Sequence, residues 1–179
     1  MIRKEGQSMC WMSFAEEIGQ LGVVVRHDVL EKNPAWTVPI ERAASVLSAD
    51  LAPDQFSECN VRELLGRSPI RTNGTQDVVV LAQAVLLALD KDGLVPASTF
   101  ESAALLLARR IREADLLSSE KTISDVAVLS HEVRCGDGTI WFPLLLDGGS
   151  VELALLPGNA VLAPYWGART SIFALPRPR

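Results

Sequence analysis

The sequence predicts an α+β fold in which N-terminal helices and a central apolar helical hairpin pack on a C-terminal antiparallel β-meander. Residues 78–89 contain a single polar side chain, Gln83, so we expect a helix that is buried on all sides. Residues 98–114 repeat apolar side chains at spacings of three and four, which is typical of a helix. After residue 117 polar and apolar residues alternate as in strands, and turn signals occur at residues 137–138 and 148–149.

Size and composition restrict the class of protein. With 179 residues, 48% of them hydrophobic, the chain can bury a core without disulfides. Its formal net charge of −5 argues against a general nucleic-acid coat, which needs clustered cations. Cys10, Cys59 and Cys135 are widely spaced and odd in number, which fits a reducing compartment better than a disulfide framework. Residues 1–9 lack the apolar run of a signal peptide, so we expect a cytoplasmic protein without a membrane segment.

The chain is expected to contain two segments in one compact domain. Residues 1–74 form an N-terminal helical segment with a short strand, and residues 75–179 form the helical hairpin and the sheet. In the first segment, Asn60 followed by Glu63 is a helix-capping pattern. The elements predicted in this segment are helices at 13–21, 37–48 and 60–66 and a strand at 23–25.

The central hairpin is marked by its second helix. Ser98 precedes Glu101 by three residues, a capping box in which each side chain satisfies a free backbone N–H group. The short linker at 90–93 predicts that the two helices run antiparallel. The expected buried stripe consists of Phe100, Ala104, Leu107, Ile111 and Ala114, and the expected solvated side consists of Arg109, Arg110, Arg112, Glu113 and Asp115.

The two turn signals predict the register of the meander. A two-residue turn at the first signal pairs Val133 with Phe142, and one at the second pairs Leu144 with Leu153. Both registers place apolar residues on the same face, which the helical hairpin is expected to cover. Pro143 cannot donate a ladder hydrogen bond and therefore predicts a sheet edge or a bulge. Two further strands are expected at 160–165 and 170–175.

Motifs for catalysis or for metal binding are weak. His131 and Cys135 lie about 13 Å apart along a strand, too far for one zinc ion to bind both, and both fall on the apolar face. His27 beside Asp28 allows a base oriented by a carboxylate, with a solvated surface histidine as the alternative. The sequence therefore predicts neither a metal site nor a cofactor, and it indicates no catalytic residue.

Aromatic and arginine residues near the C-terminus form the predicted binding surface, because such residues are typical interface anchors. Arg134 is expected to lie across from Trp141 on the face away from the core. The alternative is that Trp141 packs under the N-terminal segment. The candidate binding residues are Arg134, Trp141, Tyr165, Trp166 and Arg169.

Together these patterns predict a non-catalytic adaptor or regulatory protein that binds another protein or associates with itself. One alternative is a small enzyme whose histidine and acid are brought together by the fold. The other is a winged-helix DNA-binding regulator. It would use the arginines at 109–112 as a recognition helix and the hairpin at 126–146 as a wing.

Overall fold

In the computed structural model, the described residues are 11–32, 55–71, 77–122, 124–130, 132–160 and 166–178. They form a mixed α/β structure around one eight-stranded, mostly antiparallel sheet with the order β1-β7-β6-β4-β8-β2, in which β5 also pairs with β6 and β3 with β8. The strands are β1 (Val24–Val25), β2 (Ser57–Asn60), β3 (Leu94–Pro96), β4 (Asp125–Ala127), β5 (Val133–Arg134), β6 (Ile140–Asp147), β7 (Val151–Pro157) and β8 (Thr170–Pro176). The helices are α1 (Trp11–Gln20), α2 (His27–Glu31), α4 (Val61–Arg67), α5 (Val78–Lys91) and α6 (Thr99–Arg112), and a 3₁₀ turn, η2 (Trp166–Arg169), precedes β8.

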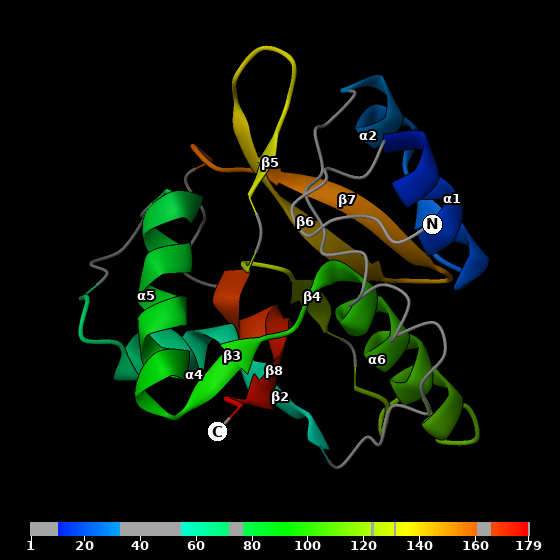
Figure 1. The fold of residues 1–179 in the computed structure, drawn as a ribbon. Coiled ribbons are helices and arrows are strands. Elements are labelled where there is room, and N and C mark those ends of the chain that lie inside the picture. The colour runs from blue at the N-terminus through cyan, green and yellow to red at the C-terminus, as the bar shows by residue number, and fades with distance from the viewer. Residues whose placement is uncertain are drawn as a thin grey trace.

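The sheet is covered on both faces. Figure 1 shows α4 and α5 on one side of the sheet and α1, α2 and α6 on the other. Each face has its own core. The first core lies under α1, α2 and α6 and includes Phe14, Ile18, Val29, Phe100, Leu106, Val126, Leu145, Leu153 and Phe173. The second core lies under α4 and α5 and includes Val61, Leu64, Val85, Leu89, Ala127, Phe142, Ile172 and Ala174.

The predicted two-layer arrangement is therefore wrong. Phe142 and Leu144 belong to the second core, whereas Leu153 belongs to the first, so the strands do not have one apolar and one polar face. The physical reason is that β6 and β7 are apolar at both odd and even positions, which is the pattern of strands buried on both faces.

The predicted helical hairpin is also wrong. After α5, strand β3 pairs with β8 and carries the chain across the sheet, so α6 packs on the opposite face from α5. Gly93, with a φ of 71°, makes the turn between α5 and β3. The short linker thus connects a helix to a strand rather than one helix to the next.

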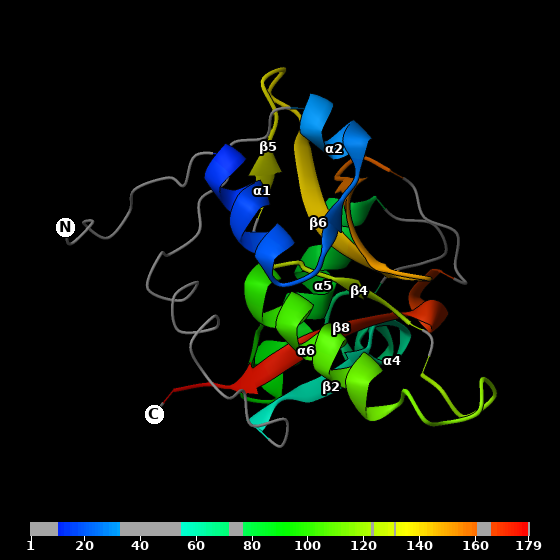
Figure 2. The ribbon, with the colours of Figure 1, turned by 90° about the vertical axis from the view of Figure 1, so that its right-hand side faces the viewer.

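The sheet joins the two predicted segments. β1 pairs in parallel with β7, and β2 pairs antiparallel with β8, so strands from both sides of residue 75 share one sheet. Figure 2 shows β2 beside β8, with α6 on the same side of the sheet as α1. The predicted helix at 37–48 and most of the predicted strand at 160–165 lie outside the described residues, while β8 confirms the strand predicted at 170–175.

Both hairpin turns occur where the sequence indicates, but each loop is one residue longer than predicted. Cys135 N donates to Thr139 O at 3.1 Å, and Gly138 adopts a φ of 82°, which is the arrangement of a three-residue loop ending in a left-handed glycine. Asp147 pairs with Val151, so residues 148–150 form the second loop.

The longer loops shift both registers by one residue. Val133 pairs with Trp141 rather than with Phe142, and Leu153 pairs with Leu145 rather than with Leu144. Such a shift transfers every side chain of a strand to the other face. The sheet accommodates it because both of its faces are buried.

Pro143 lies inside the sheet, where the ladder on one side of β6 is interrupted between β4 and β5. Its carbonyl accepts from Val128 N at 2.9 Å, so its nitrogen, on the same side of the strand, also faces the segment between β4 and β5. Ala127 of β4 pairs with Leu144, and Val133 of β5 pairs with Trp141, so the ladder along this side of β6 is interrupted between β4 and β5. Neither an edge nor a one-residue bulge is therefore found at this proline: one side of β6 has an interrupted ladder here, and on the other side Pro143 pairs with Leu155.

The predicted caps of two helices are confirmed. Asn60 Oδ1 accepts from Glu63 N at 3.3 Å at the start of α4, and Ser98 Oγ accepts from Glu101 N at 3.2 Å at the start of α6. Asp77 caps α5 by accepting from Val80 N at 2.9 Å. As predicted, α5 is largely buried. No helix among the described residues combines the length and the apolar character needed to cross a lipid bilayer.

The buried face of α6 agrees with the predicted stripe only in part. Phe100 is buried in the first core, and Ala104 and Leu107 pack against it as predicted. Ala103 and Leu106 are also buried there, whereas Ile111 is exposed. A helix apolar at several spacings offers more than one possible stripe, and the neighbouring strands select among them. The consequence is greatest at Arg109, which was predicted to be solvated and is buried.

Candidate functional site

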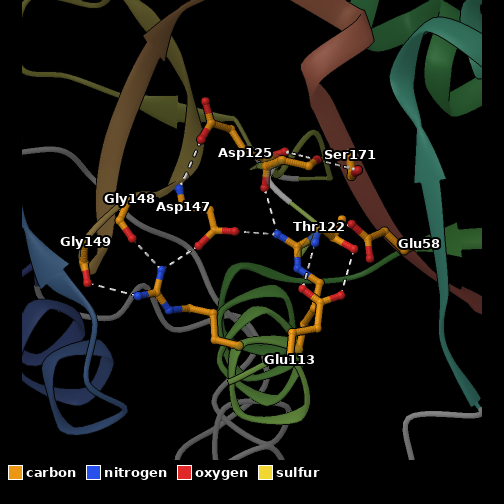
Figure 3. Close-up of polar contacts among 11 residues, drawn as sticks. Glu58, Glu113, Thr122, Asp125, Asp147, Gly148, Gly149 and Ser171 are labelled. Carbon is orange, nitrogen blue, oxygen red and sulfur yellow. Dashed lines mark hydrogen bonds and ion pairs between the residues drawn. The ribbon is translucent and has the colours of Figure 1, made fainter. Parts of the chain in front are cut away.

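The last turn of α6 carries a buried ion cluster centred on Arg109. Its side chain is 2% exposed and forms ion pairs with Glu58 of β2 and, at 2.8 Å, with Asp147 of β6. Its Nη2 also donates to the backbone oxygen of Ser124 at 2.9 Å. Figure 3 shows Glu58 and Asp147 approaching the cluster from two sides. One guanidinium therefore ties α6 to two strands and to the residue that precedes β4.

Arg110 extends the cluster to the turn between β6 and β7. Its Nη1 donates to Asp147 Oδ1 at 2.6 Å and to Gly148 O at 2.7 Å, and its Nη2 donates to Gly149 O at 2.9 Å. Asp147 therefore accepts from two neighbouring arginines through its two carboxylate oxygens. Its backbone N–H donates to Asp125 Oδ1 at 3.0 Å, which links β6 to β4.

The cluster has a structural role. Two guanidinium groups face two carboxylates, and the polar atoms around them are largely paired, although Arg109 Nε has no partner among the described residues. Buried charges of opposite sign and good geometry fix positions because removing one leaves the other unpaired. The cluster therefore holds the C-terminal end of α6 against the sheet.

Beyond this anchored end, residues 113–122 form a loop that we call the α6–β4 loop. Its two ends are joined by a clasp: the backbone N–H and the hydroxyl of Thr122 donate to the two carboxylate oxygens of Glu113, at 2.9 and 2.7 Å. Within the loop, Leu117 N donates to Glu120 Oε2 at 3.3 Å, and Glu120 N donates to Leu117 O at 2.9 Å. These bonds hold the loop in a compact conformation.

The clasp affects the ionisation of Glu113. Desolvation raises the pKa of this carboxyl, but the side-chain and backbone hydrogen bonds from Thr122 lower it, and Arg109 and Arg112 lower it further. The net pKa is below the ordinary value of glutamate. The charged form is thus the one that the clasp binds.

Large apolar side chains are exposed at this end of the molecule. Ile111 is 77% exposed, Leu116 41% and Leu117 70%. We call these three residues the apolar corner. Figure 2 shows the end of α6 and the following loop projecting away from the sheet. Six large hydrophobic residues are exposed in the described parts of the chain, and half of them lie in these seven consecutive positions. Large apolar side chains exposed at neighbouring positions make this segment the candidate interaction site.

The structure places Trp141 differently from the predicted binding surface. Trp141 pairs with Val133 and packs against the first core, while Arg134 pairs with Ile140 and so projects from the opposite face. The cation that contacts Trp141 is Lys32, whose Nζ lies 4.6 Å from the ring centroid. This arrangement agrees with the alternative in which Trp141 packs under the N-terminal segment.

Of the other predicted binding residues, the two that the structure describes, Arg134 and Arg169, do not lie beside Trp141. Arg169 is exposed in η2, just before Thr170 pairs with Asp125, which is near the far end of β6 from Trp141. Tyr165 and the side chain of Trp166 lie outside the described residues. The register shift separates Arg134 from Trp141, because it transfers the two side chains to opposite faces.

Neither His27 nor Cys135 takes part in the ion cluster. His27 is exposed, and its Nε2 lies 3.1 Å from Glu31, its i+4 neighbour, rather than contacting Asp28. His131 lies outside the described residues, and Cys135 is buried. Where the structure describes the chain, no three His, Cys, Asp or Glu side chains are grouped so that they could hold a metal ion.

The arginines of the predicted recognition helix have internal partners in two of three cases. Arg109 and Arg110 bind Asp147, and Arg112 is exposed. Sequence reasoning missed the ion cluster because its acids lie 51 and 38 residues from Arg109. A signal was present in Asp147, a charged residue that ends a continuous apolar run at residues 140–146.

No protein-family model, curated protein or solved structure significantly matches this chain.

Proposed function

We propose that this protein is a non-catalytic binding or regulatory protein and that it contacts another protein through the apolar corner of Ile111, Leu116 and Leu117. The observation that carries the proposal is the exposure of these three large side chains beside a buried ion cluster. Burying an exposed Leu or Ile side chain contributes roughly 1.5–3 kcal/mol, so a partner that covers the corner gains substantial free energy.

The contacts that hold the corner in place support the proposal. Arg109 and Arg110 fix the helix end from which Ile111 projects, and the clasp between Glu113 and Thr122 closes the loop that carries both leucines. A surface that is already ordered loses less conformational entropy on binding, which improves affinity. The contacts that order this surface come from the protein itself.

The alternative functions receive less support from the described residues. The enzyme alternative relied on a histidine placed beside an acid by the fold, and the described pair, His27 with Glu31, lies on the surface within one short helix. The DNA-binding alternative relied on three arginines of α6, and two of them are engaged in the ion cluster.

Site-specific photo-crosslinking in the cells that produce the protein tests the proposal. A photoreactive residue is placed at position 111 or 117, with position 83 as the control, because Gln83 is exposed on α5 on the other side of the sheet. We expect crosslinked protein adducts at 111 and 117 well above those at 83. A probe at position 141 tests the surface predicted from the aromatic residues. Equal yields at 83, 111 and 117 would contradict the apolar corner as the binding surface.

A further inference from the structure

We draw no further inference here: the strongest candidate, the first turn of α6, where the buried hydroxyl groups of Thr99 and Ser102 have no hydrogen-bond partner among the described residues, carries nothing, because nothing in the described part of the structure shows a cavity or a ligand beside them and the buried carboxylate of Glu101 in the same turn opposes the anion that a helix N-terminus otherwise favours.

Discussion

Arg109 of α6 donates to Asp147 of β6 at 2.8 Å, although the two residues are separated by 38 positions in the chain. Arg110, the next residue, binds the other oxygen of the same carboxylate at 2.6 Å. Two neighbouring arginines of one helix turn thus share one acid at the end of a strand. This contact fixes the end of α6. It therefore also fixes the position from which the α6–β4 loop and the apolar corner project.

Replacing Arg109 is expected to destabilise the fold. Arg109→Met keeps an unbranched, mostly apolar side chain but leaves Asp147, whose side chain is largely buried, with one guanidinium partner fewer. Removing one partner of a buried ion pair typically costs about 3–5 kcal/mol, and we expect a loss of unfolding free energy in this range. Chemical denaturation followed by circular dichroism measures it.

The matched control for this variant is Arg112→Met. Arg112 lies on the same helix but is exposed, and it has no ion pair in the described part of the chain. Surface substitutions of this kind usually change stability by less than about 0.5 kcal/mol. Equal losses for the two variants would show that Arg109 contributes nothing special to the fold.

The clasp between Glu113 and Thr122 is expected to make stability depend on pH. Desolvation raises the pKa of Glu113 in the folded protein, but the hydrogen bonds from Thr122 and the charges of Arg109 and Arg112 together lower it below its ordinary value. A carboxyl with a lowered pKa contributes stability that is present above its unfolded pKa and is lost as the pH falls through the folded pKa. Thr122→Val, which removes the hydroxyl donor, should therefore destabilise the protein at neutral pH and have a smaller effect once Glu113 is protonated.

We expect the loss at neutral pH to be about 0.5–1 kcal/mol, the small value that suits an exposed hydrogen bond. Denaturation curves at neutral pH and below the ordinary pKa of glutamate measure the two values, and NMR titration of the Glu113 carboxyl gives its pKa directly. Thr122→Ser, which retains the hydroxyl, serves as the control and should resemble the wild type. A pKa of Glu113 that does not rise in Thr122→Val would contradict the role of the clasp.

The thiols of Cys59 and Cys135 should react slowly in the native protein. Burial is the largest cause that raises the pKa of each thiol, and nearby carboxylates, among them Asp137 beside Cys135, raise it further. The opposing effects of Arg67 on Cys59, and of Thr139 and Lys32 on Cys135, are smaller. A raised pKa lowers the thiolate fraction at neutral pH, and the thiolate is the reactive form.

Alkylation with iodoacetamide followed by peptide mass spectrometry checks this expectation. Both cysteines should be modified more slowly in the native protein than in denaturant, and the native rate should increase with pH beyond neutrality. Native alkylation of either thiol as fast as in denaturant would indicate an activated cysteine and would favour the enzyme alternative.

Gly158 is expected to tolerate no side chain. A Cβ at this position would lie 2.9 Å from the backbone oxygen of Ile140 and 3.1 Å from a methyl group of Val79. Gly158 O also accepts from Val79 N at 3.1 Å, which seats the start of α5 on the end of β7. Gly158→Ala should therefore cost about 1–3 kcal/mol, as overpacking typically does.

The control is Gly136→Ala, because a Cβ at Gly136 meets no atom within 4 Å. Thermal unfolding of the two variants measures the difference. A Gly158→Ala variant with the melting temperature of the wild type would mean that the contact between α5 and β7 is looser than the structure indicates.

Local features of the sequence determined the helix starts, the buried α5 and the positions of the hairpin turns. Asn60, Asp77 and Ser98 cap their helices with hydrogen bonds to residues three positions later, so the information lies within one turn. The turn signals were likewise local. Their loop lengths were not determined by the signals, since a glycine in the left-handed conformation suits a three-residue loop as well as a two-residue one.

Tertiary structure decided what no local pattern can encode: which faces of the sheet are covered, and where the chain crosses from one face to the other. The continuous apolar runs of β6 and β7 were compatible with two-sided burial, but α6 had to be placed opposite α5 before the second core existed. The burial of Arg109 could not be predicted for the same reason. From the sequence, an arginine on a helix is expected to be solvated, and the acids that pair with Arg109 come from distant strands. The periodicity of apolar residues shows which side chains of a helix or strand lie on the same face. Whether that face is buried depends on the elements that the rest of the chain packs against it.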